Sequence, residues 1–225
     1  MVRQRGEDRD VHPEIVLPCL DEAEALPYVL KRMPDDWPVI VVDNGSTDDT
    51  AAVARGHGAR VVVEPRRGYG AAVHAGLEAA TGELVAFLDG DGSLDPDVLP
   101  GMAETVASGR ADIAVGRRVP DTVGVWPWHA RAANAVIAGM LRARGVPVHD
   151  IAPIRVARRQ ALLDLQIEDR AFGYPLELLL RAGRAGWRFD EIPVAYSRRA
   201  GGRSKVSGSV TGTVRAGRDM IRLLR

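Results

Sequence analysis

Short apolar runs alternate with helical patterns along the first half of the chain, and this alternation decides the fold class. Helices are expected to begin at Ser46, at Gly68 and at Asp95-Pro96. An earlier helix has the i, i+3, i+4, i+7 spacing of one buried face, at Leu26, Val29, Leu30 and Met33. The apolar runs have the composition of buried strands and cover residues 14–20, 39–42, 61–63, 84–88 and 112–116. Strands and helices in this order predict an α/β protein with a mostly parallel sheet flanked by helices.

The second half of the chain has a less regular pattern. No repeat, low-complexity tract or linker divides the chain, and its 225 residues suffice for one full α/β domain, expected over residues 14–205. A polar leader, residues 1–13, precedes this domain, and a basic tail, residues 206–225, follows it and is expected to be helical. The elements expected in the second half are a strand near Ile154, an extended segment at 146–151, helices at 130–144, 158–165 and 175–185, and a last strand at 187–194.

Acidic residues follow three of the expected strands. Glu22 comes shortly after the first strand, Asp43 ends the second, and Asp89 and Asp91 follow the fourth. The carboxyl ends of parallel strands share one edge of the sheet, where ligands of open α/β sheets bind. Two carboxylates one residue apart are costly to ionise together without a cation, and hard oxygen ligands favour Mg²⁺ or Mn²⁺ completed by substrate phosphates. Taken alone, the segment 89–91 would more often be a solvated Asp-Gly turn.

Positive charge is spread unevenly along the chain. The 30 basic and 30 acidic residues cancel, which argues against a nucleic-acid partner. Arg117 ends the fifth strand, and Arg203, Ser204 and Lys205 follow two glycines late in the chain. Glycine permits close backbone approach, and these side chains are good donors to phosphate. The segment 203–205 is therefore interpreted as a phosphate-binding loop, with a solvated basic loop as the alternative.

Several common sites are excluded because their motifs are missing. The segment 68–73 fails as a dinucleotide fingerprint because Val73 occupies the third glycine position, and no phosphate loop ending in Gly-Lys-Ser/Thr is present. The single cysteine, Cys19, excludes an internal disulfide.

The leader lacks the apolar core of a signal peptide, and no window approaches the roughly 18 apolar residues of a membrane span. A cytoplasmic location is expected, extending to the inner face of the membrane if the tail binds lipid.

Four segments in order carry a resemblance to a known family. The chain resembles the family 2 glycosyltransferases of the GT-A fold and is most similar to the catalytic domain of dolichyl-phosphate or polyprenyl-phosphate mannose and glucose synthases. The resemblance covers roughly residues 14–120, with a late Gly-Arg-Ser-Lys element beyond it. The segments are Val16-Leu17-Pro18-Cys19-Leu20-Asp21-Glu22, Val42-Asp43-Asn44-Gly45-Ser46-Thr47-Asp48-Asp49-Thr50, Arg67-Gly68-Tyr69-Gly70-Ala71-Ala72 and Asp89-Gly90-Asp91.

The resemblance implies inverting transfer of a sugar from a UDP- or GDP-sugar to an acceptor, with a polyprenyl phosphate as the first candidate and a soluble small molecule as the second. Residues 14–120 would bind the nucleotide sugar, and residues 121–205 would form the acceptor side. Asp89 and Asp91 would hold Mg²⁺ or Mn²⁺, and Arg117 would add positive charge. Asp91 is also expected to be a catalytic residue, because the cation it would bind stabilises the leaving diphosphate. Glu177 and Asp150 are the candidates for a general base. The donor-binding residues would be Pro18, Leu20, Glu22, Asp43, Gly68, Ala71, Asp89, Gly90, Arg203, Ser204 and Lys205.

Two other classes remain open at this stage. A sugar-phosphate nucleotidyltransferase shares the sheet and the paired acids, but it usually opens with a glycine-rich basic loop where this chain has Cys19-Leu20-Asp21-Glu22. A non-catalytic nucleotide-sugar binder would keep Asp43 and could lose Asp91 or the basic loop. The tail is interpreted either as a cationic amphipathic helix resting on a membrane or as a helix packed on the domain.

Overall fold

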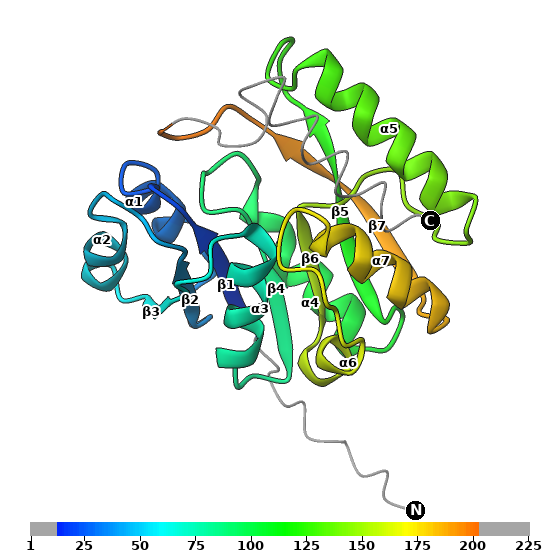
Figure 1. Ribbon diagram of the computed structural model, residues 1–225, viewed down its shortest axis with the longest axis horizontal. Coiled ribbons are helices and arrows are strands. Elements are labelled where there is room, and N and C mark those ends of the chain that lie inside the picture. The colour runs from blue at the N-terminus through cyan, green and yellow to red at the C-terminus, as the bar shows by residue number, and fades with distance from the viewer. Residues whose placement is uncertain (1–12, 203–225) are drawn as a thin grey trace, which may run out of the picture.

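The computed structural model describes residues 13–202, and within them it forms one seven-stranded sheet (Figure 1). The strands lie in the order β3-β2-β1-β4-β6-β5-β7, and only β6 runs antiparallel to its two neighbours. The mostly parallel α/β architecture predicted from the sequence is therefore confirmed. The strand bounds are β1 Glu14–Cys19, β2 Val39–Asp43, β3 Arg60–Val63, β4 Leu84–Phe87, β5 Ile113–Pro120, β6 Ile154–Arg158 and β7 Phe189–Tyr196.

Helices cover both faces of this sheet. The side chains of β1 alternate between two apolar clusters: Val16 packs with α3, α5, α6 and α7, whereas Ile15 and Leu17 pack with α1, α2 and α4. Ile15, Val16 and Leu17 are all fully buried, so both faces of β1 are apolar and its sequence is a continuous apolar run. The helix bounds are α1 Leu26–Lys31, α2 Thr50–Gly56, α3 Tyr69–Ala79, α4 Leu99–Ala107 after a 3₁₀ turn at Pro96–Val98, α5 Trp128–Arg142, α6 Arg159–Asp164 and α7 Tyr174–Arg184.

Two local expectations are corrected by the structure. The helix expected to start at Ser46 begins at Thr50, because the Ser46 hydroxyl accepts a hydrogen bond from the Asp21 backbone N–H at 3.0 Å instead of capping the helix. The fifth strand continues past Gly116 to Pro120, since β7 pairs with it along its whole length. This longer β5 carries Arg117 and Arg118 on a strand and points them to opposite sides.

The carboxyl ends of β1, β2 and β4 meet on one side of the sheet. Strand β4 is buried throughout and ends two residues before Asp89. Gly90 is required there, because a Cβ at this position would lie 2.5 Å from the Cys19 sulfur of the neighbouring strand. Gly92 adopts a φ of +73°, which allows the loop to turn back. The fold therefore brings the two acids of this loop beside the end of β1.

Candidate functional site

A cavity of about 930 Å³ opens at the carboxyl ends of β1 and β4. Its floor contains seven of the residues singled out from the sequence: Pro18, Leu20, Glu22, Gly68, Asp89, Gly90 and Asp91. Two others are not part of the lining: Asp43 pairs with Cys19 in the sheet and its carboxylate accepts from the Ser46 N–H at 2.9 Å, and Ala71 is buried in α3. The proposed phosphate loop, Arg203, Ser204 and Lys205, lies outside the described residues, as do the leader to residue 12 and the tail.

A segment that we term the strap, residues 197–202, lies across the acidic loop. The Ser197 N–H donates to the Ser93 carbonyl at 2.8 Å, and the Ala200 N–H donates to the Asp91 carbonyl at 2.9 Å. Between these two backbone contacts, the Arg199 guanidinium donates to Asp91 Oδ2 and, at 2.5 Å, to Glu22 Oε1. A cationic side chain thus sits between two carboxylates at the place where the sequence predicts a metal ion.

Asp89 lines the same cavity, and its pKa is shifted from the ordinary value of an aspartic acid. Burial and the neighbouring Asp91 carboxylate raise its pKa to about 7, while the charges of Arg118, Arg155 and Arg199 act in the opposite direction. Burial, followed by the charge of Asp89, also raises the pKa of the Tyr69 phenol well above its ordinary value. A buried carboxylate of this kind is stabilised when a cation arrives. The carboxylates of Asp89 and Asp91 therefore fit a divalent cation.

Arg118, and not Arg117, lines the cavity. Both oxygens of the fully buried Asp150 accept from the Arg118 guanidinium, at 2.9 and 2.6 Å, and the Trp126 ring stacks 4.1 Å from it. The exposed Arg117 points the other way and lies 3.9 Å from Glu191. Asp150 is therefore already engaged by an arginine, and it positions that arginine at the cavity wall.

Glu177 is also engaged by donors rather than open to the cavity. Its carboxylate lies 2.6 Å from Arg181 and accepts from the backbone N–H groups of Glu168 and Asp169. It is 6% exposed. These bonds hold the loop before α7, and the next residues of that loop, Ala171 and Phe172, line the cavity. In this structure the role of Glu177 is to shape one wall.

Several lining residues were not singled out from the sequence. Asn44 links two loops: its Nδ2 donates to the carbonyls of Glu64 and Arg66, and its Oδ1 accepts from the Gly68 N–H at 2.8 Å. The motif that contains Asn44 could have indicated it. Arg67 and Tyr69 also lie in one of the quoted segments, beside Gly68. For three others no local signal exists, because they come from distant parts of the chain: Phe172, Tyr196 and Arg199.

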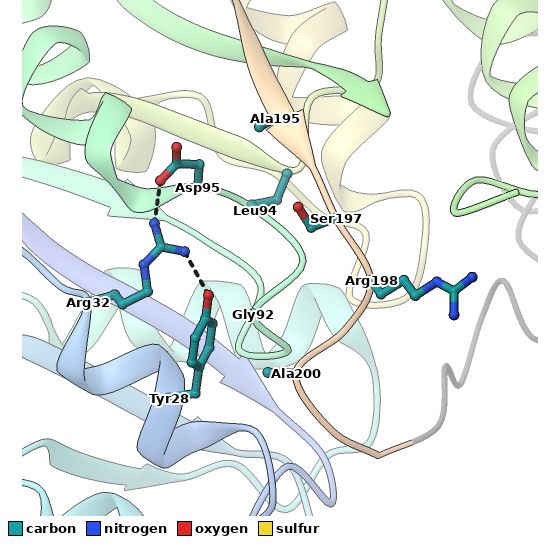
Figure 2. A pocket seen from close by; sticks show the side chains of 9 residues that line it. All are labelled: Tyr28, Arg32, Gly92, Leu94, Asp95, Ala195, Ser197, Arg198 and Ala200. Atoms are coloured by element: carbon teal, nitrogen blue, oxygen red, sulfur yellow. Dashed lines mark hydrogen bonds and ion pairs between the residues drawn. The ribbon is translucent and has the colours of Figure 1, made fainter. Parts of the chain in front are cut away.

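A smaller cavity of about 470 Å³ adjoins the strap and shares Ser197 and Arg198 with the main one. Figure 2 shows Tyr28 of α1 and Arg32, the residue that follows α1, on one side of it, with Arg32 hydrogen-bonded to the Tyr28 hydroxyl and paired with Asp95 at 2.7 Å. These contacts tie α1 to the segment that follows the acidic loop. They support the loop from outside the main cavity.

Within residues 13–202, no group of three or more His, Cys, Asp or Glu side chains is arranged to hold a metal ion by itself. Asp89 and Asp91 can supply two carboxylate groups as ligands. A divalent ion bound here would take its remaining ligands from phosphate oxygens and water, as Mg²⁺ commonly does in nucleotide sites.

The chain is similar to known proteins along most of its length. The family model described as Glycosyl transferase family 2 matches residues 14–165. An uncharacterized glycosyltransferase of Mycobacterium tuberculosis is 57% identical over 201 residues, covering 89% of this chain and 92% of the relative. The polyprenol monophosphomannose synthase of Mycolicibacterium smegmatis is 34% identical, covering 87% of this chain and 81% of that protein. The dolichyl-phosphate hexose transferase of Haloferax volcanii is 31% identical, with 83% of each chain covered.

Solved structures share the fold. Glucosyl-3-phosphoglycerate synthase from Mycobacterium tuberculosis, in complex with Mn²⁺, UDP and glucosyl-3-phosphoglycerate, matches with a TM-score of 0.73 at 24% identity. The match covers 96% of this chain and 79% of that one. A structure of the same enzyme with Mg²⁺ and UDP gives a TM-score of 0.72. These matches confirm the fold predicted from the sequence.

Proposed function

We propose that this chain, which belongs to glycosyl transferase family 2, transfers a hexose from a nucleoside diphosphate donor to a polyprenyl phosphate with inversion. Its membership and its named relatives make it a glycosyltransferase, as the sequence resemblance predicted. The observation that carries the finer proposal is the cavity itself. The paired carboxylates Asp89 and Asp91 and the guanidinium of Arg118 line this same cavity. An enzyme that joins a metal-bound diphosphate to an anionic acceptor needs both signs of charge within one site.

The donor would enter along the carboxyl ends of β1 and β2. Pro18, Leu20 and Gly68 line the cavity and would contact the nucleoside, together with Asp43 at the end of β2. Glu22 and Gly90 would border the diphosphate. Asp89 and Asp91 would hold Mg²⁺ or Mn²⁺. When bound, such an ion stabilises the charge of the departing nucleoside diphosphate. Solved structures of the same fold contain either ion together with UDP.

The arginines would bind the anions on both sides of the bond that breaks. Arg199 lies on Asp91 and Glu22 in the present structure, and it would exchange these partners for diphosphate oxygens when the donor enters. Arg118, held by Asp150, faces the cavity from the acceptor side. We assign the basic segment that follows the strap, Arg203, Ser204 and Lys205, to the same anion-binding wall.

The acceptor decides whether a general base is needed. A phosphate monoester is already an anion at neutral pH and attacks the anomeric carbon without losing a proton first. Asp150 and Glu177 are both engaged by arginines, so the proposal gives them positioning roles and leaves the attack to the acceptor oxygen itself. Arg117 takes no part, since it lies on the other side of β5.

The names of two relatives support a polyprenyl phosphate acceptor: one is a polyprenol monophosphomannose synthase, and the other is a dolichyl-phosphate hexose transferase. No helix within residues 13–202 is long and apolar enough to cross a bilayer. A lipid acceptor would therefore be reached from the membrane surface, at the cytoplasmic face where nucleotide sugars occur. The second candidate acceptor is a soluble phosphorylated acid, as in the enzyme whose structures share this fold.

The test has two steps. Calorimetry with UDP- and GDP-sugars, with Mn²⁺ and again with a chelator, should give metal-dependent binding of one nucleotide class. Transfer of that sugar is then measured to a detergent-solubilised polyprenyl phosphate and to 3-phosphoglycerate. Product on the lipid supports the proposal, and product only on the soluble acid overturns its acceptor. Absence of metal-dependent donor binding contradicts the mechanism and favours a non-catalytic binder or a nucleotidyltransferase.

A further inference from the structure

Helix α5 is apolar on both of its faces. Its inner face, Ile137, Ala138 and Leu141, is buried against the domain. Its outer face is exposed and carries, at helical spacing, Trp128, Ala132, Ala135 and Val136. A surface helix of a globular protein normally presents charged or polar residues on that side. Figure 1 shows α5 at one edge of the molecule, beside the end of the sheet formed by β5 and β7.

The exposed apolar surface extends beyond the helix. Trp128 is 81% exposed and Val136 57%, and Val123, in the loop before α5, is fully exposed. Val119, at the end of β5, is 41% exposed. Within residues 13–202, six large hydrophobic side chains are exposed, and these four come from one segment of 18 residues. Such clustering marks a contact surface, since single exposed apolar residues elsewhere need no explanation.

The charge of this segment has one sign. Between Asp121 and Asp150 the sequence contains no acidic residue, and it contains Arg131, Arg142 and Arg144. Arg131 is exposed and lies one turn from Trp128, beside the apolar face. An aromatic residue at an interface, small apolar residues and flanking arginines are the features of a helix that lies on an anionic bilayer.

We propose that the outer face of α5, together with Val123, docks on an anionic lipid bilayer. This inference rests on the proposed lipid acceptor and states how the protein reaches it. The loop that carries Val123 continues into Gly124, Val125 and Pro127, which line the main cavity. Docking of this face brings that side of the cavity to the lipid headgroups, where the phosphate of a polyprenyl phosphate lies.

Charge favours the bilayer over other partners for this face. The segment 203–225 carries six basic residues and one acidic residue, so it shares the sign of α5. In a two-fold dimer through this face, Arg131 and Arg142 of each copy would approach those of the other. Anionic phospholipid is complementary to the arginines and also accepts the apolar side chains.

The experiment measures partition of the full-length protein into sedimentable vesicles of phosphatidylglycerol and phosphatidylcholine that contain no polyprenyl phosphate. Val136→Glu should weaken partition by at least about tenfold, and Trp128→Ala by about fivefold. The matched control is Val63→Glu, because Val63 is 61% exposed on β3 at the opposite edge of the sheet. This control should leave partition within about twofold of wild type. Thermal unfolding and metal-dependent donor binding should be the same in all four proteins.

Wild-type partition of both α5 variants, or an equal loss with Val63→Glu, would overturn the proposal. So would loss of partition on removing residues 203–225 when Val136→Glu has no effect, since the tail would then be the membrane contact. A solution dimer that Val136→Glu dissociates would assign the face to a second copy instead. The outcome is separable from the proposed function, because transfer to detergent-solubilised polyprenyl phosphate tests the acceptor without a bilayer.

Discussion

The two ends of the sheet hold similar charged residues in different ways. At the amino ends of the strands, two acids each have a well-defined partner: Glu14 accepts from the backbone N–H groups of Thr81 and Gly82, and Asp112 pairs with Arg188 at 2.9 Å. At the carboxyl ends, the negative charges of Asp89 and Asp91 repel each other, and arginines from distant segments partly compensate them. The difference indicates that charge at the amino end serves stability, whereas charge at the carboxyl end is arranged for a ligand.

The largest effect is expected from Asp91→Asn. Loss of one anionic ligand should lower the turnover of sugar transfer by about a thousandfold, because the charge of the leaving diphosphate is then poorly stabilised. The unfolding temperature should stay near that of wild type. Steady-state kinetics and calorimetry check both quantities. The matched control is Asp112→Asn, which makes the same chemical change at the other end of the sheet and should leave turnover unaltered; full activity of Asp91→Asn would remove the distinction between the two ends.

A smaller effect is expected from Arg199→Ala on metal binding in the absence of donor. The guanidinium bonds Asp91 Oδ2 and Glu22 Oε1, so its removal takes a competing positive charge away from the place where a cation would bind. The affinity for Mn²⁺ alone should rise by about fivefold, the size of one partly exposed ion pair. Titration calorimetry measures this. Arg198→Ala, one residue away on the strap, is the control; if it tightens Mn²⁺ binding equally, the effect comes from net charge and not from the pair.

At the amino end, Glu14→Ala should affect stability alone. Glu14 is 7% exposed, and its loss leaves the buried N–H groups of Thr81 and Gly82 without their acceptor. We expect the free energy of unfolding to fall by about 2 kcal/mol. Urea denaturation measures this fall, and turnover per folded molecule should be unchanged. A variant with wild-type stability but reduced turnover would connect this end of the sheet to the site.

The smallest effect concerns Asp112→Asn and pH. Hydrogen bonds from the Arg188 side chain and backbone, together with its charge, lower the pKa of Asp112. A carboxyl with a lowered folded pKa stabilises the protein above its unfolded pKa, and this contribution is lost as the pH falls through the folded value. The wild type should therefore be more stable than the variant by about 0.5 kcal/mol at neutral pH, and the two should converge below about pH 3. A difference that persists in acid would contradict this assignment.

The sequence predicts one half of the molecule better than the other. Strands β1 to β4 are parallel to one another, with β1, β2 and β4 largely buried and β3 at the edge of the sheet, and each forms a short apolar run that is followed by an acidic residue. Strand β6 leaves a similar run, but the direction of a strand has no periodic signature, so its antiparallel insertion between β4 and β5 could not be foreseen.

The candidate site divides in the same way. Asp89 and Asp91 were predicted because their motif is local. The sequence singled out Arg117, whereas Arg118 lines the cavity, because two adjacent strand residues face opposite sides and the sequence does not say which side is the cavity. Arg199 was missed because its partner Asp91 is 108 residues away in the chain. Contacts at such a separation exist only once the sheet has closed.

The position of β6 also constrains how the protein is made. Strand β5 reaches the β1–β4 part of the sheet only through β6, which is synthesised later and lies between them. A nascent chain that has left the ribosome as far as Pro120 therefore has β5 without a partner on either side and β4 with one edge open. Unpaired edges recruit other strands. The interval before residues 154–158 emerge is thus the period in which a nascent chain of this protein is most exposed to misassembly and most dependent on chaperones.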